Sequence, residues 1–194
     1  MVWDLGEVSS GEKSVPICEI ELELKNGSTK ALFNIAKCIV SLLPTAIGMD
    51  SKAARGYKLL DGLPVKEFAA YEHYQSENIK TEAEEFASLL TTQLHDFQML
   101  SVEIRRQYSE VLTTNIKQVL LGLEDNVGGF SHHFPCPPLD SIHRQLKTLV
   151  HEWCLVTQQD NNSAADSLLV CAQTTQLQLD IVQCLVEQSW FSEV

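Results

Sequence analysis

The sequence predicts an α+β protein in which a short antiparallel β-segment precedes a longer, all-helical region. Two stretches near the N-terminus, 2–8 and 16–25, have the composition and alternation of β-strands. From about residue 78 onward, apolar residues instead recur every three or four positions, as they do along the buried stripe of a helix. A hydrophobic fraction of 44% in 194 residues is enough to form the core of one domain or of two small ones.

The two strands are expected to form a hairpin. The connecting segment, 9–13, has the serine and glycine content of a turn. Pro16 is expected to open the second strand, because its missing N–H matters least there.

Three glutamates alternate with aliphatic residues along the second strand. Because successive side chains of a strand point to opposite faces, Glu19, Glu21 and Glu23 are expected to project from one face. Such neighbouring anions repel one another unless water or a cation screens them. A row of carboxylate oxygens suits hard divalent ions such as Mg²⁺ or Mn²⁺, and the alternative is a solvated face of a half-buried strand.

A helix is predicted after the second strand. Ser28 can cap a helix that begins near Thr29, and Pro44 ends it. A basic, small-residue segment then covers 51–57. A domain boundary is placed within 68–78, which divides the chain into units 1–68 and 76–194.

The second unit is predicted to be a bundle of helical hairpins. Gly128 and Gly129 are expected to break one helix, and prolines 135, 137 and 138 are expected to form a rigid loop. His132, His133 and Cys136 lack the two ligand clusters of a zinc site, so a polar loop is the preferred interpretation. No nucleophile–histidine–acid arrangement is evident from residue spacing.

The charge distribution excludes some classes of partner. The net charge is −12, of which residues 1–75 contribute −2 and residues 76–194 contribute −10. This acidity argues against nucleic acid or anionic lipid as a partner. No apolar run approaches the roughly 20 residues of a membrane span, and the start of the chain does not resemble a signal peptide. Six scattered cysteines are interpreted as reduced, mostly buried thiols, so a cytoplasmic protein is predicted.

Two sequence motifs, in the order in which they occur along the chain, resemble the CYTH domain of bacterial inorganic triphosphatases, which are triphosphate tunnel metalloenzymes. They are Pro16-Ile17-Cys18-Glu19-Ile20-Glu21-Leu22-Glu23-Leu24 and, after a helix, Ser51-Lys52-Ala53-Ala54-Arg55-Gly56-Tyr57. The stretch Asp4-Leu5-Gly6-Glu7-Val8 also resembles the acidic strand that precedes the first motif in that family. The likeness covers about residues 2–67, and the helical remainder resembles the start of the CHAD domain that follows CYTH in such proteins.

The resemblance implies a closed antiparallel barrel with a polar tunnel, of which this chain would contain a hairpin and a helix. Glu19, Glu21, Glu23 and Asp4 would hold Mg²⁺ or Mn²⁺ in that tunnel. Lys52 and Arg55 would contact tripolyphosphate or another phosphoanhydride, and the alternative for both is a solvated charge in a loop.

One departure from the family limits this expectation. The opening strand of the family, Glu-x-Glu-x-Lys, is missing, as are the basic strands that normally follow it. The chain is therefore expected to be the C-terminal part of a CYTH domain joined to the N-terminal part of a CHAD domain. It would have little triphosphatase activity alone, and it would pair with a missing N-terminal half or form a homodimer. The alternative is a non-catalytic module for binding or scaffolding.

Overall fold

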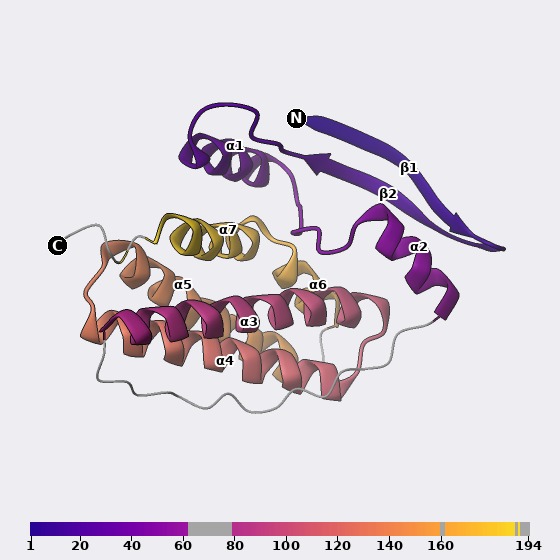
Figure 1. Cartoon of the computed structure of the whole chain (residues 1–194). Coiled ribbons are helices and arrows are strands. Elements are labelled where there is room, and N and C mark those ends of the chain that lie inside the picture. Colours follow the sequence, from indigo (N-terminus) through magenta and orange to yellow (C-terminus); the bar gives the residue numbers. More distant parts are fainter. Residues whose placement is uncertain (62–78, 160–161, 189, 191–194) are drawn as a thin grey trace.

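The computed structural model describes residues 1–61, 79–159, 162–188 and 190. A two-stranded hairpin is followed by helices, which confirms the α+β class (Figure 1). The elements are β1 Val2–Ser10, β2 Lys13–Glu21, α1 Thr29–Leu42, α2 Lys52–Asp61, α3 Ile79–Arg106, α4 Glu110–His133, α5 Pro137–Gln158, α6 Asn162–Leu169 and α7 Ala172–Glu187. The predicted domain boundary at 68–78 lies outside the described residues.

The hairpin closes through a two-residue loop in which Gly11 has a φ of 61°. A positive φ at the first central position is typical of a type II′ turn, and glycine adopts it without steric cost. The second strand begins three residues before Pro16, so the prediction that Pro16 opens it was wrong. Pro16 lies opposite Glu7, at a position where the backbone nitrogen faces away from β1, and no bond between the strands is therefore lost.

Helix α1 begins and ends where the sequence predicted. The hydroxyl oxygen of Ser28 accepts a hydrogen bond from the amide of Ala31 at 3.3 Å, and the helix ends two residues before Pro44. Only Phe33 and Val40 are buried on it, because the helix packs against α7 along one side only.

Helix α2 packs against β1 and starts at Lys52, with the Ser51 hydroxyl oxygen accepting from the Ala54 amide at 3.1 Å. The helix comes into van der Waals contact with the strand at Gly56, where a Cβ would lie 3.4 Å from a methyl carbon of Val8. Lys13 donates to the carbonyl oxygen of Leu59 at 3.1 Å, so a cation from the hairpin binds the last turn of α2.

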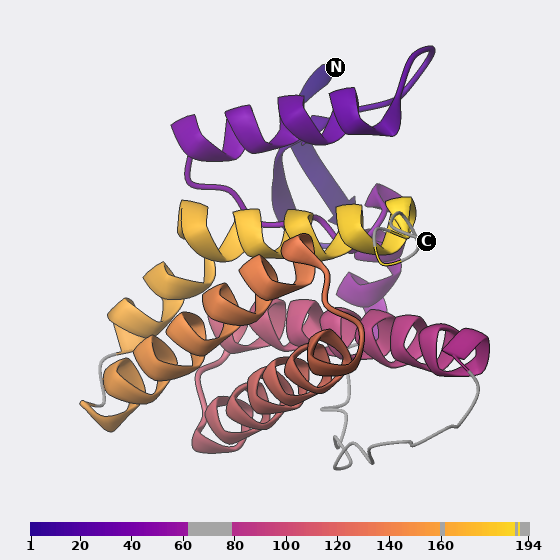
Figure 2. The same cartoon turned by 90° about the vertical axis from the view of Figure 1, so that its left-hand side faces the viewer.

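The remaining helices share one hydrophobic core. Helix α3 packs on α4, α4 on α5, and α5 on α6 and α7. In Figure 2, α7 lies between α1 and α5 and contacts both helices. Trp153 is fully buried in this core and donates its indole N–H to the carbonyl oxygen of Thr113 on α4 at 3.3 Å.

Two predictions for this region were wrong. Helix α4 continues through Gly128 and Gly129, and Gly128 makes room for a side chain of the neighbouring helix α5. A Cβ on Gly128 would lie 2.5 Å from Nε2 of His143 on α5. Pro137 and Pro138 open α5, where a fixed φ and a missing N–H suit the first turn of a helix.

No disulfide joins the six cysteines, and only Cys136 and Cys184 are buried, so the expectation of mostly buried thiols was wrong. None of the helices in the described part of the chain combines the length and the hydropathy that a membrane span requires.

Candidate functional site

The two faces of the hairpin differ in what they contact. Residues directly opposite one another in the register share a face, so Asp4 and Glu19 lie together, and Glu21 lies beside them opposite Val2. This face also contains Val8 and is the one against which α2 packs. The carboxylates therefore lie on the face of the hairpin that α2 partly covers.

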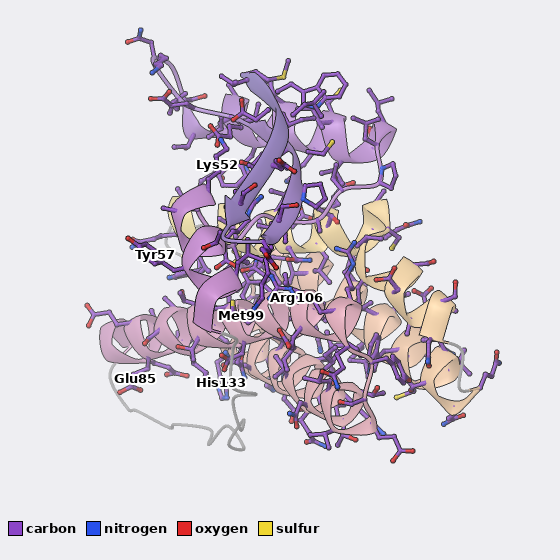
Figure 3. The ribbon with its side chains drawn as sticks, turned by 90° about the vertical axis from the view of Figure 1, so that its right-hand side faces the viewer. Lys52, Tyr57, Glu85, Met99, Arg106 and His133 are labelled. Carbon is purple, nitrogen blue, oxygen red and sulfur yellow. The ribbon has the colours of Figure 1, made fainter. Side chains whose placement is uncertain are left out.

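Three carboxylates and two cations meet where α2 crosses the hairpin. One oxygen from each of Asp4, Glu19 and Glu21 lies within 4.8 Å of the others. The ammonium of Lys52 contacts all three carboxylates, at 2.9 Å from Glu21, 3.2 Å from Glu19 and closer still to Asp4. Figure 3 shows Lys52 at the end of α2 that lies beside the strands. We call these four residues together with Arg55 the charge cluster.

Arg55 adds the second cation, one helical turn after Lys52. Its guanidinium donates to the carboxylate of Glu19 and, at 3.2 Å, to the backbone oxygen of Asp50. Arg55 and Glu19 are each about one-fifth exposed, whereas Glu21 is more than half exposed. The cluster thus has a shielded end at Glu19 and an open end at Glu21, with a formal net charge of −1.

The structure does not bring Glu23 into the cluster. The second strand ends at Glu21, so the alternation that the sequence suggested stops before Glu23. Its carboxylate lies 2.6 Å from the ammonium of Lys25, and both side chains are exposed.

The proximity of opposite charges shifts two pKa values. The hydrogen bond from Arg55 lowers the pKa of Glu19 from its ordinary value of 4.5; partial burial opposes this shift, and the hydrogen bond from Lys52 reinforces it. Hydrogen bonds to Asp4 first, and then to Glu21 and Glu19, raise the pKa of Lys52. The two pKa shifts favour the ionised forms of Glu19 and Lys52.

The chemistry of the donor set fits a hard divalent cation, with one condition. Carboxylate oxygens are the ligands that Mg²⁺ and Mn²⁺ prefer, and Asp4, Glu19 and Glu21 offer three of them. However, the ammonium of Lys52 contacts all three carboxylates, so an ion would have to displace it. Once displaced, Lys52 would be free to contact an anion.

Sequence patterns missed the contact between the cations and the carboxylates. A spacing of three residues places Lys52 and Arg55 on one face of a helix, and that signal was available in the sequence. Which residues this face of α2 contacts, however, depends on how the helix packs on the hairpin.

Other candidate groups lie apart from the cluster. His132 and His133 end α4, and buried Cys136 immediately precedes α5; among the described residues they do not form a metal-binding group. A cavity of about 270 Å³ lies between α1, α5 and α7, with Lys37 and Asp180 in its lining. Its lining includes none of the metal-binding or phosphate-binding candidates that the sequence suggested.

A comparison with models of known protein families finds no match for this sequence.

Proposed function

We propose that the charge cluster is part of a divalent-metal and polyphosphate site, and that the chain represents part of a metal-dependent inorganic triphosphatase. The proposal rests chiefly on the convergence of Asp4, Glu19 and Glu21 with Lys52 and Arg55. In this interpretation the hairpin, α1 and α2 are the C-terminal part of a CYTH-like unit, and the later helices are the beginning of a CHAD-like unit.

The acidic and the basic residues of the charge cluster would have different roles. Asp4, Glu19 and Glu21 would hold Mg²⁺ or Mn²⁺, and the ion would supply charge compensation for the oxygens of a tripolyphosphate. Lys52 and Arg55 would bind phosphate oxygens and stabilise negative charge on the leaving group. The open end of the cluster at Glu21 is the side from which a substrate would approach.

Mn²⁺ binding tests the site directly. The free-ion signal in electron paramagnetic resonance should fall on titration of the chain, and this loss should be absent in Glu19→Gln/Glu21→Gln. Glu7→Gln/Glu12→Gln is a matched control, because it removes the same charge from exposed hairpin positions outside the cluster. Equal Mn²⁺ binding by the two double variants would contradict the metal assignment.

Hydrolysis is tested separately. Phosphate release from tripolyphosphate with Mg²⁺ should be slow but measurable in this chain and slower still in Glu21→Ala. Equal rates in the two would remove the hydrolase proposal for this chain, whatever the Mn²⁺ result.

A second candidate function is a non-catalytic binding or scaffolding module. It is favoured by the pairing of Lys52 and Arg55 with the carboxylates, since the cluster nearly balances its own charge. This candidate function predicts no phosphate release from tripolyphosphate with any divalent metal ion.

A further inference from the structure

The outer edge of β1 offers unpaired backbone groups. Ser10 and Lys13 form the closing, hydrogen-bonded pair of the hairpin. From Ser10 back along β1, residues whose backbone groups bond to β2 alternate with residues whose N–H and C=O point away from β2. The outward-pointing set is Trp3, Leu5, Glu7 and Ser9. Within the described residues, no hydrogen bond reaches the backbone groups of this set. An exposed strand edge of this kind is a template for another strand.

The two edges of the hairpin are not equivalent. The outer edge of β2 contains Pro16, which has no N–H to donate, so its ladder would be interrupted. The edge of β1 contains no proline. Strand addition is therefore expected on β1.

Apolar side chains beside this edge are exposed. Trp3 is 68% exposed and Leu5 is 69% exposed, and both lie on the hairpin face opposite the charge cluster. A strand added beside β1 would place its own side chains next to these two on that face. Apolar residues there would cover Trp3 and Leu5 and bury them from water.

The other face of the edge is acidic. Asp4 lies there, and the charge cluster retains a formal net charge of −1 after its two cations are counted. A basic side chain directly opposite Asp4 would sit about 5 Å away, Cβ to Cβ, and would neutralise the cluster. The added strand should therefore present a basic residue to this face and apolar residues to the other.

We propose that β1 docks an extended strand of another polypeptide in which a basic residue opposite Asp4 is flanked by apolar residues that cover Trp3 and Leu5. A second copy of this chain fits less well. Residues 1–21 contain five acidic residues and one basic residue, and each chain has a net charge of −12, so two hairpins would repel each other.

The probe is the acetylated and amidated peptide Thr-Val-Thr-Val-Lys-Val-Thr-Val. Its binding is followed by NMR, through the protection from hydrogen exchange of the amides of Trp3, Leu5, Glu7 and Ser9. The valines carry the amides that would face β1, so N-methylation of alternate valines should weaken binding at least about tenfold. N-methylation of the same number of threonines, whose amides face away, is the matched control and should have little effect.

Two protein variants test the edge itself. Leu5→Pro removes one outward N–H without touching the bonds to β2, and it should weaken peptide binding at least about tenfold relative to Leu5→Ala, which keeps the N–H. Replacing the peptide lysine with glutamate should also weaken binding, since Asp4 would then face a like charge.

Several results would overturn the proposal. These are no binding of the parent peptide, equal binding of the two methylated peptides, and binding that protects none of the four amides. If the four amides are already protected without peptide and light scattering shows a dimer, the occupant is a second copy and the proposal is wrong. If Leu5→Pro fails to fold, Leu5→Ala and the methylated peptides still decide the outcome.

Discussion

Lys52 is the residue on which the charge cluster depends. Its single ammonium contacts three carboxylates, and without it two strands would present Asp4, Glu19 and Glu21 to one another with only Arg55 to offset them. Because Lys52 is substantially exposed, water screens these contacts and they add little to global stability. Their consequence is local: they hold α2 in a fixed relation to the hairpin.

Arg55 is predicted to control the titration of Glu19. Since its hydrogen bond is the largest cause of the lowered pKa, Arg55→Met should raise the pKa of Glu19 toward 4.5. A lowered pKa in the folded state contributes stability above the unfolded value, and this contribution is lost as pH falls through the folded value. The variant should therefore lose less stability than the parent as pH falls below about 4.5.

The carbon resonance of the Glu19 carboxyl group, followed by NMR against pH, measures this shift. Arg105→Met is the control, because Arg105 pairs with Asp166 far along the chain from Glu19. An unchanged Glu19 titration in Arg55→Met would show that another group sets the pKa.

At the scale of elements, helices α4 and α5 lie close together because one glycine has no side chain. His143 on α5 occupies the space beside Gly128 and bonds Glu124 on α4 at 2.8 Å. Interior glycines normally weaken a helix by about 1 kcal/mol relative to alanine, so the sequence suggested a break. The close packing of the two helices offsets that cost.

Replacement of the two adjacent glycines should have opposite effects. Gly128→Ala would force His143 away from Glu124 and should lower the free energy of unfolding by about 1–3 kcal/mol. Gly129→Ala meets no atom within 4 Å and should raise stability by up to about 1 kcal/mol through helix propensity. Urea denaturation measures the free energy of unfolding of both variants. Equal values would mean that α5 shifts to accommodate the added methyl group without loss of stability.

At the scale of the whole molecule, burial is concentrated in the helices. The core cluster is drawn from α3 to α7 with Cys136 beside α5, whereas the hairpin buries only Ile17. A two-stranded hairpin is marginal in water unless another element packs on it, and here α2 does so. The hairpin is therefore expected to be the less stable part.

Hydrogen exchange with mass spectrometry can check this difference. Bonded amides of β1 and β2 should exchange at least about tenfold faster than amides in the middle of α4, because local opening exposes little apolar surface. Equal protection in both would show that the hairpin opens only when the helical core unfolds.

Local chemistry explains most of what could be predicted from the sequence. Ser28 and Pro44 bound α1 because capping and the loss of an N–H act within a few residues. The alternation along 16–21 predicted a strand with carboxylates on one face, and that held as far as Glu21. The same reasoning failed at Glu23, because where a strand ends depends on its partner, and the pairing of β2 with β1 ends at Glu21 and Val2.

What the sequence alone determined is the α+β class, the hairpin, the ends of α1 and the candidate residues Asp4, Glu19, Glu21, Lys52 and Arg55. Only the tertiary structure decided that Lys52 and Arg55 contact those carboxylates, that Glu23 stands apart, and that Gly128 joins two helices. The physical reason is the range of the interactions: strand alternation and helix caps are set by neighbours in the chain. By contrast, the contacts between Lys52 and the hairpin join residues more than 30 positions apart and form only when α2 packs on β1.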